Sequence, residues 1–170
     1  MKLYDKLSFD GKNKIIEKDE FLYYKLIALQ KTDKIQDADK ILKDVFVKKI
    51  STIHQYKLMK AKADYFIRNK NNTGALELYK NITNTSFAKK NKLVIETKIA
   101  DLYYLLNQYD KALAEYKRIE QKKINMEWVL FQKTNIYRKK NMNKKAELEI
   151  EKLKKLNPES FWLKQLNKNV

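Results

Sequence analysis

The amino-acid sequence predicts an all-α fold, and three observations carry this prediction. The chain of 170 residues holds only two glycines and one proline, too few for the tight turns of a β-sandwich, a β-barrel or an α/β fold. A hydrophobic fraction of 44% is enough to fill the core of one domain of ordinary size. Apolar side chains also recur at helical spacing. We therefore expect one helical domain over residues 1–170.

Four alanines mark an internal repeat. They lie 37, 37 and 34 residues apart, and each is followed four residues later by a bulky apolar side chain. An aliphatic side chain follows after three more residues, and offsets of zero, four and seven share one face of an α-helix. The alanines are Ala38, Ala75, Ala112 and Ala146; the side chains at the fourth position are Leu42, Tyr79, Tyr116 and Ile150.

A second helix precedes three of these alanines. Small residues stand twelve positions before the alanine and aromatic residues nine positions before it, again on one helical face. Polar turns rich in asparagine, at 69–74, 107–110 and 140–143, separate the two helices and can supply caps or left-handed conformations. Each unit is therefore predicted to be an antiparallel helical hairpin. The small residues are Ala63, Ala100 and Thr134, and the aromatic residues are Phe66, Tyr103 and Tyr137.

The units follow one another along the chain. We expect an amino-terminal segment over 1–19, a divergent repeat over 20–50 whose second helix alone matches well, and three repeats over 55–87, 92–121 and 126–157. A capping helix over 158–170 should close the array, with Asn157 as its cap and Pro158 at its first helical position. Its amphipathic face would comprise Phe161, Trp162, Leu163 and Leu166.

This pattern resembles the tetratricopeptide repeat, a helical hairpin of about 34 residues with small, aromatic and alanine positions at fixed offsets. Ala100, Tyr103, Ala112 and Tyr116 match all four central positions of the third unit. The resemblance implies a right-handed α-solenoid of stacked antiparallel helix pairs. Lysines depart from it at positions 62 and 133, where leucine is usual. A composition rich in lysine, asparagine and isoleucine, which suggests an AT-rich bacterial source, and Ser160-Phe161-Trp162 after the last repeat also look like the carboxyl-terminal repeats of bacterial cell-envelope or flagellar-motor scaffolds.

The resemblance places a partner-binding surface on the concave face, which the first helix of each repeat lines. There we expect a groove for a peptide or partner helix, with Tyr104, Trp128 and Phe131 as apolar anchors and basic side chains that select an acidic ligand. Plain packing of Trp128 against Phe131 is the alternative. The carboxylate clamp of some tetratricopeptide proteins is not expected, because Thr97 and Phe131 stand where its cations would be. The candidates are Lys57, Lys60, Asp64, Arg68, Thr97, Asp101, Tyr104, Trp128, Phe131, Asn135 and Arg138.

The net charge of +17 leaves a second interpretation open. A lysine-rich face near the carboxyl-terminal repeat could bind RNA, DNA or another anionic surface. Two facts argue against it. Of the 38 basic residues only Arg68, Arg118 and Arg138 are arginines, and Glu147, Glu149 and Glu151, which we expect to be solvated, interrupt the face. The lysine excess is also what an AT-rich genome produces.

Catalysis, cofactors, metals and a small-molecule substrate are not expected. The chain has no cysteine, one histidine, His54, and two isolated glycines, which excludes cysteine-ligated metal sites and glycine-rich phosphate loops. Charges interrupt the first residues, so we expect no export signal. The longest apolar run, 102–106, is far shorter than a membrane span. We expect a cytoplasmic protein if the chain is complete, and a periplasmic or envelope-associated one if it belongs to a longer exported protein.

Overall fold

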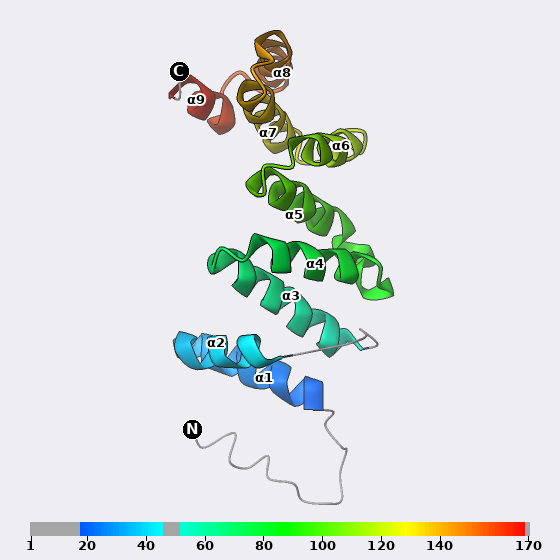
Figure 1. Ribbon diagram of the computed structural model, residues 1–170, viewed down its shortest axis with the longest axis vertical. Coiled ribbons are helices and arrows are strands. Elements are labelled where there is room, and N and C mark those ends of the chain that lie inside the picture. Colours follow the sequence, from blue (N-terminus) through cyan, green and yellow to red (C-terminus); the bar gives the residue numbers. More distant parts are fainter. Residues whose placement is uncertain (1–17, 46–51, 169–170) are drawn as a thin grey trace, which may run out of the picture. The chain divides into compact units, whose positions relative to one another are not determined.

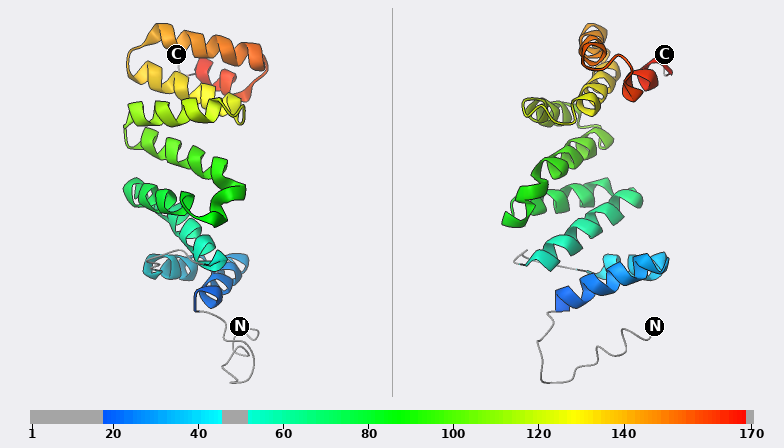
Figure 2. Two further views of the ribbon diagram at one scale, coloured as in Figure 1. Left: turned by 90° about the vertical axis from the view of Figure 1, so that its right-hand side faces the viewer. Right: turned by 180° about the vertical axis from the view of Figure 1, so that it is seen from behind.

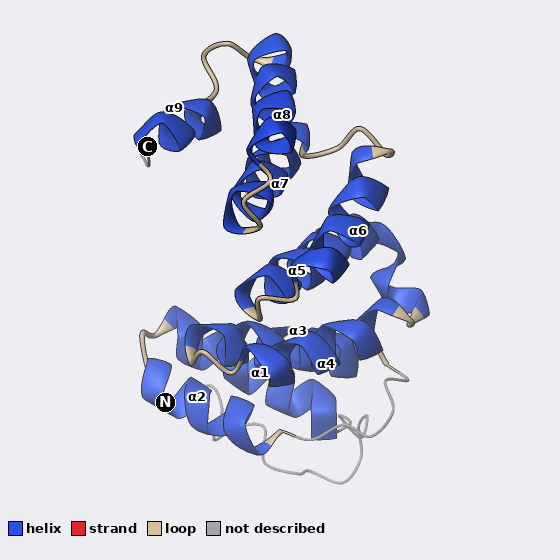
Figure 3. Ribbon diagram, turned by 45° about the horizontal axis from the view of Figure 1, so that its top comes forward, coloured by secondary structure: helices blue, strands red, loops and turns tan. Residues whose placement is uncertain are grey.

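The structure is a computed structural model that describes residues 18–45 and 52–168, and within these ranges every regular element is a helix. Figure 1 labels the α-helices in chain order, and Figure 3 shows the loops that connect them. The bounds are α1 Lys18–Lys31, α2 Ile35–Asp44, α3 Ile53–Arg68, α4 Asn72–Thr83, the 3₁₀ helix η1 Ser86–Asn91, α5 Lys92–Leu105, α6 Tyr109–Glu120, α7 Met126–Lys139, α8 Asn143–Leu156 and α9 Phe161–Lys168. The all-α prediction is confirmed.

The chain divides into two compact units, Met1–Leu58 and Met59–Val170, and the boundary falls inside α3. In the first unit α1 and α2 pack together and bury Leu26, Ala38 and Leu42. The start of α3 joins α1 through the amide of Gln55, which donates a 2.6 Å hydrogen bond to Asp19. The first unit therefore contains a helical hairpin, although its sequence matches the repeat pattern only in part.

The turns within the helix pairs share one backbone geometry. Asp33, Lys70, Asn107 and Asn141 each stand five residues before a repeat alanine, and each adopts a left-handed conformation with φ between 56° and 59°. In every case the next amide donates to the carbonyl five residues earlier, at 2.8–2.9 Å. This is the Schellman ending of an α-helix. The prediction that the polar turns supply left-handed residues is confirmed.

Alanines and aromatic rings build the core of the second unit, which Figure 2 shows as successive helix pairs. Ala63, Ala75, Ala100 and Ala112 are fully buried, so neighbouring backbones can approach closely. Thr134, at the position of Ala63 and Ala100, is also fully buried, and its hydroxyl donates a hydrogen bond to the Leu130 carbonyl at 2.9 Å. Tyr79 and Tyr116 are among the largest fully buried side chains. The small and aromatic positions of the repeat are thus the packing positions.

Gly74 does not lie in the turn where the sequence analysis placed it. It stands in the first turn of α4, and its amide donates to the side chain of Asn71, the N-cap. A Cβ atom on Gly74 would lie 2.8 Å from Cδ2 of Phe66. The glycine therefore makes room for the Phe66 ring, and Lys70 supplies the left-handed residue instead.

The carboxyl-terminal helix begins later than predicted. Pro158 and Glu159 form a turn, and α9 begins at Phe161, so Pro158 does not occupy the first helical position. Asn157 does not cap α9 either, because its side chain accepts from the nearby Glu159 amide at 3.1 Å. Leu163 and Leu166 are buried against Leu130 and Leu153 as expected, whereas Phe161 is 60% exposed. The helix covers the last pair through its leucines and Trp162.

Candidate partner-binding face

Most of the predicted binding residues occupy equivalent positions on the first helices of the repeats. We call the part of this surface in the second unit, on α3, α5 and α7, the first-helix face. It comprises Lys60, Asp64 and Arg68 of α3, Thr97, Asp101 and Tyr104 of α5, and Trp128, Phe131, Asn135 and Arg138 of α7. Lys57 belongs to the first unit, where its ammonium lies 4.8 Å from the centroid of the Tyr23 ring.

On α3 the charged candidates are engaged by neighbours. Lys60 pairs with Asp64 at 3.1 Å, one helical turn away. The other carboxylate oxygen of Asp64 accepts from the hydroxyl of Tyr79 on α4 at 2.5 Å. Arg68 is exposed, and its guanidinium carbon lies 6.0 Å from the centroid of the Tyr65 ring. Asp64 therefore ties the two helices of its pair together.

The same bond recurs one repeat later. The Tyr116 hydroxyl of α6 donates to Asp101 of α5 at 2.5 Å, and the indole of Trp128 on α7 donates to the same oxygen at 3.0 Å. Burial raises the pKa of Asp101, and the hydrogen bonds from Tyr116 and Trp128 oppose that rise. Burial, followed by the charge of Asp101, raises the pKa of Tyr116. Asp101 therefore links one repeat to the next.

The remaining α5 candidates differ in accessibility. Thr97 is buried, and its hydroxyl donates a hydrogen bond to the Leu93 carbonyl of the same helix at 2.9 Å. This hydroxyl is therefore not accessible to a partner. Tyr104 is half-buried beside Tyr109, with 5.9 Å between the ring centroids. Val94 is 51% exposed at the position equivalent to Trp128. The sequence analysis missed Val94, although repeat spacing alone identifies it.

On α7 the two predicted aromatic anchors contact α9. The Trp162 ring lies 4.6 Å from that of Trp128 and 4.9 Å from that of Phe131, measured between centroids. Trp128 and Phe131 also stack on each other at 5.5 Å. Arg138 donates to the main-chain carbonyl of Leu166 at 3.1 Å. The first-helix face of the last repeat is thus covered by a helix of the same chain. Asn135, also on α7, is half-buried.

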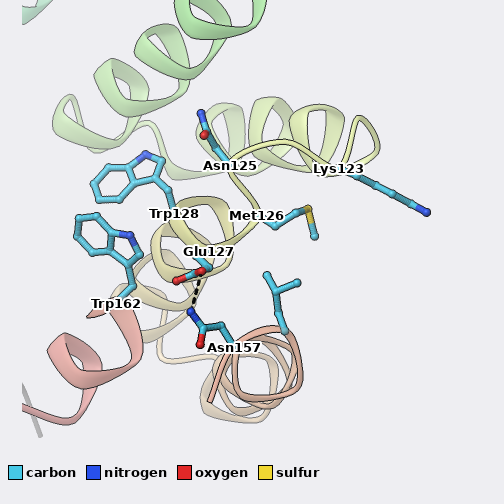
Figure 4. Close-up of a pocket in the computed structure, with 8 residues that line it drawn as sticks. Lys123, Asn125, Met126, Glu127, Trp128, Asn157 and Trp162 are labelled. Atoms are coloured by element: carbon cyan, nitrogen blue, oxygen red, sulfur yellow. Dashed lines mark hydrogen bonds between the residues drawn. The ribbon is translucent and has the colours of Figure 1, made fainter. Parts of the chain in front are cut away.

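Glu127, which the sequence analysis did not single out, fastens the segment that leads into α9. One carboxylate oxygen accepts from the Asn157 amide at 3.0 Å, and the other accepts from the Ser160 hydroxyl at 2.5 Å. The hydrogen bonds from Ser160 and then Asn157 lower the pKa of Glu127. Figure 4 shows Glu127 between Trp162 and Asn157. A carboxylate in the first turn of α7 therefore anchors α9.

A hollow of about 640 Å³ opens beside this anchor. It lies where the start of α7 meets the end of α8 and the start of α9, and Figure 4 shows the Trp128 and Trp162 side chains together on one side of it. Its lining residues are Lys123, Asn125, Met126, Glu127, Trp128, Leu156, Asn157 and Trp162.

Three charged side chains, Lys133, Glu149 and Glu96, are buried between neighbouring helices, and none of them was predicted to be buried. Lys133 is 2% exposed and contacts Glu120 of α6 at 2.5 Å and Glu149 of α8 at 3.0 Å. Burial alone would lower the pKa of Lys133, but the hydrogen bonds that its ammonium donates to Glu120 and Glu149 outweigh this effect and raise the pKa. Glu149 is buried, so its predicted place on a solvated face is wrong. Glu96 of α5 is likewise buried and pairs with Lys122 at 2.7 Å.

The described residues contain neither a cluster of metal-ligating side chains nor a helix that could span a membrane. In residues 18–45 and 52–168, no group of three or more histidine, cysteine, aspartate or glutamate side chains is placed to hold a metal ion. Over the same residues, no helix has the length and apolar character that a membrane span requires.

Comparison with known proteins identifies the fold. No family model and no curated protein matches the chain. A tetratricopeptide repeat protein from Parabacteroides merdae superposes with a TM-score of 0.65 at 20% identity, over 85% of this chain and 56% of that one. The chain thus spans little more than half the length of that relative. Pseudomonas aeruginosa PilF matches with a TM-score of 0.63 at 17% identity, over 99% of this chain and 74% of PilF. The fold of the chain is a tetratricopeptide-like, all-α helical-repeat solenoid.

Proposed function

We propose that the chain is a non-catalytic scaffold that binds a peptide or a segment of a partner protein on the first-helix face. The observation that carries this proposal is the packing of α9 against α7. An amphipathic helix already lies on Trp128 and Phe131, which shows that side chains at these positions can hold a helical segment. Helix-in-groove binding uses the same contacts between molecules.

Electrostatics favour an acidic partner. The chain carries 38 basic and 21 acidic side chains, which give a net charge of +17. Such a charge attracts anionic segments and speeds their association. The first-helix face itself carries three cations, Lys60, Arg68 and Arg138, and two carboxylates, Asp64 and Asp101. Its formal charge is therefore positive by one unit, in the same direction as the charge of the whole chain.

Site-specific photo-crosslinking tests this proposal. A photoreactive amino acid at Val94 samples the first-helix face, and the same residue at Leu148 samples the outer surface of α8. Val94 is 51% exposed and Leu148 is 57% exposed, so the two positions are matched in accessibility. We expect a discrete protein adduct from position 94 in cells and none from position 148. Equal labelling at both positions, or adducts at position 148 alone, would contradict the proposal.

Nucleic-acid binding is the competing function, and several cations it would use are already paired. Lys140 contacts Asp110, Lys152 contacts Glu149, and Arg138 contacts the Leu166 carbonyl. Exposed lysines remain on α8, among them Lys144 and Lys155. A salt titration with generic RNA and DNA separates the two functions, because affinity for phosphates falls steeply with salt. We expect no micromolar complex at physiological ionic strength.

A further inference from the structure

The last repeat carries a helix of its own chain where a partner would bind. Trp162 covers Trp128 and Phe131, and the carbonyl of Leu166 meets Arg138. Leu163 and Leu166 insert beside Leu130 and Leu153. Figure 2 shows α9 next to the α7 and α8 pair in both views. A segment that replaced α9 would have to supply an aromatic ring and two apolar side chains at the spacing of Trp162, Leu163 and Leu166.

The polar chemistry of α9 fits this surface poorly. Phe161–Lys168 contains two lysines and no acidic residue, although the chain it packs against is strongly positive. Arg138 donates one hydrogen bond to a neutral acceptor, the carbonyl of Leu166. A guanidinium can bind a carboxylate through two parallel, charge-assisted bonds, which are stronger than a bond to a neutral acceptor. An acidic helix would therefore satisfy Arg138 better than α9 does.

The attachment of α9 is also limited in extent. The helix has eight residues, which is too short to be stable in water by itself. Phe161, its first residue, is 60% exposed. Its order therefore depends on the contacts of Trp162, Leu163 and Leu166 and on the anchor at Glu127. Competition for these contacts would release it.

We propose that α9 is an internal competitor, and that the partner is an acidic amphipathic helix that displaces α9 from α7. The partner helix would place an aromatic side chain on Trp128 and Phe131, apolar side chains on Leu130 and Leu153, and a carboxylate on Arg138. This inference rests on the proposed function and names the partner class for its last repeat. The fraction of chains with α9 released sets the apparent affinity.

Two synthetic peptides provide the probe. The first has the sequence of residues 157–168, and the second carries Asn167→Glu and Lys168→Glu, directly after the residue whose carbonyl meets Arg138. The chain has no cysteine, so Asn167→Cys in the full protein gives a single attachment point for a spin label. Asn167 is an exposed position of α9. We expect the acidic peptide to bind at least tenfold more tightly than the first and to mobilise the label. Arg138→Gln should remove most of that tenfold difference, and Lys144→Ala on α8 should leave it unchanged.

A third peptide controls for general attraction to a positive chain. It keeps the acidic residues and adds Leu163→Ser and Leu166→Ser. Equal binding of this peptide, or binding of the acidic peptide with an immobile label, overturns the inference and leaves the first-helix face on α3 and α5 to the crosslinking test. A tenfold difference that survives Arg138→Gln also overturns it. So does a label that becomes mobile with protein concentration alone, because α9 would then exchange between two copies of the chain.

Discussion

The hydroxyl of Tyr116 donates a 2.5 Å hydrogen bond to a carboxylate oxygen of Asp101. One repeat earlier, the hydroxyl of Tyr79 donates to a carboxylate oxygen of Asp64 at the same distance. Each bond joins the two helices of a pair across fifteen residues of sequence. In the last repeat Asn135 and Ile150 stand at these positions, and they cannot form the bond. The bond is thus a repeated structural element, and it places two predicted binding residues in a supporting role.

We expect Tyr116→Phe to destabilise the chain by about 1–3 kcal/mol, because it removes one hydrogen-bond donor from the half-buried carboxylate of Asp101. The indole of Trp128 still donates to Asp101, which keeps the loss below that of removing both donors. Urea unfolding followed by circular dichroism measures the change. Tyr109→Phe is the matched control, since its hydroxyl bonds the exposed Asn107 side chain. Equal losses of stability for the two substitutions would mean that the bond to Asp101 stabilises the chain no more than the exposed bond to Asn107 does.

The buried ion pair of Lys133 leads to a second prediction. Lys133→Leu restores the residue that is usual at this position of the repeat. Among the described residues, it leaves Lys152, at 3.2 Å, as the cation that pairs with the buried carboxylate of Glu149. Removing one partner of a buried pair costs about 3 kcal/mol or more. We expect a loss of that order for Lys133→Leu, reduced by the contact of Lys152. Chemical denaturation of the purified variant measures it.

The double variant Lys133→Leu with Glu149→Leu tests the cause. Replacing both partners of a buried pair by apolar groups removes the unpaired charge, and such exchanges are often neutral or stabilising. We expect the double variant to recover most of the stability lost in Lys133→Leu. A double variant as unstable as the single one would mean that packing of the lysine stem, rather than pairing with Glu149, holds α7 and α8 together.

Ala112 and Lys133 are both buried, but the sequence predicts the burial of Ala112 alone. Ala112 and the other repeat alanines are predictable because close helix packing restricts size at a position that recurs along the chain. Lys133 breaks the pattern, and its partners Glu120 and Glu149 come from two other helices. A lysine at a position that is usually buried requires a carboxylate on a neighbouring helix, and this requirement could have pointed to Glu120 and Glu149. Periodicity by itself assigns Glu149 to solvent.

The contacts of α9 were predictable only in part. An amphipathic helix after the last repeat follows from Trp162, Leu163 and Leu166. Its placement on Trp128, Phe131 and Arg138 depends on the Glu127 bonds to Asn157 and Ser160, which set the path of the connecting segment. Local sequence encodes the helix, but three residues from separate elements position it. The sequence therefore predicts the anchors Trp128 and Phe131 and the amphipathic helix as separate features, and does not predict that the helix packs on the anchors.

The Glu127 anchor should make the docking of α9 sensitive to acid. The pKa of this carboxyl is lowered in the folded chain from an ordinary value of 4.5, so its stabilising contribution is present above pH 4.5 and is lost as pH falls through the folded pKa. We expect the tryptophan fluorescence of Trp128 and Trp162 to change in this acidic range before the repeat helices unfold. Glu127→Gln should show part of the acid signal already at neutral pH, whereas Glu151→Gln on exposed α8 should behave as wild type. A wild-type titration curve for Glu127→Gln would contradict the anchor.

The left-handed turn residues allow a comparison between repeats. Lys70, Asn107 and Asn141 share φ values of 56–59°, but a lysine in this conformation costs roughly 1–2 kcal/mol, whereas asparagine tolerates it. Glycine has no Cβ and enters the region without that penalty. We expect Lys70→Gly to stabilise the chain by about 1 kcal/mol, after the entropy of the unfolded glycine is subtracted, and Asn107→Gly to change stability by less than about 0.5 kcal/mol.

Thermal and urea unfolding of the two glycine variants measure this difference, and Asn69→Gly provides the control. Asn69 immediately precedes Lys70, is not among the residues with positive φ, and donates its side-chain amide to the Tyr65 carbonyl at 2.9 Å. Glycine at position 69 should therefore destabilise, because it loses that bond and gains only flexibility. A stabilising Asn69→Gly would show that the effect of glycine in this turn does not depend on a left-handed backbone, and a neutral Lys70→Gly would show that the left-handed backbone at position 70 is not strained.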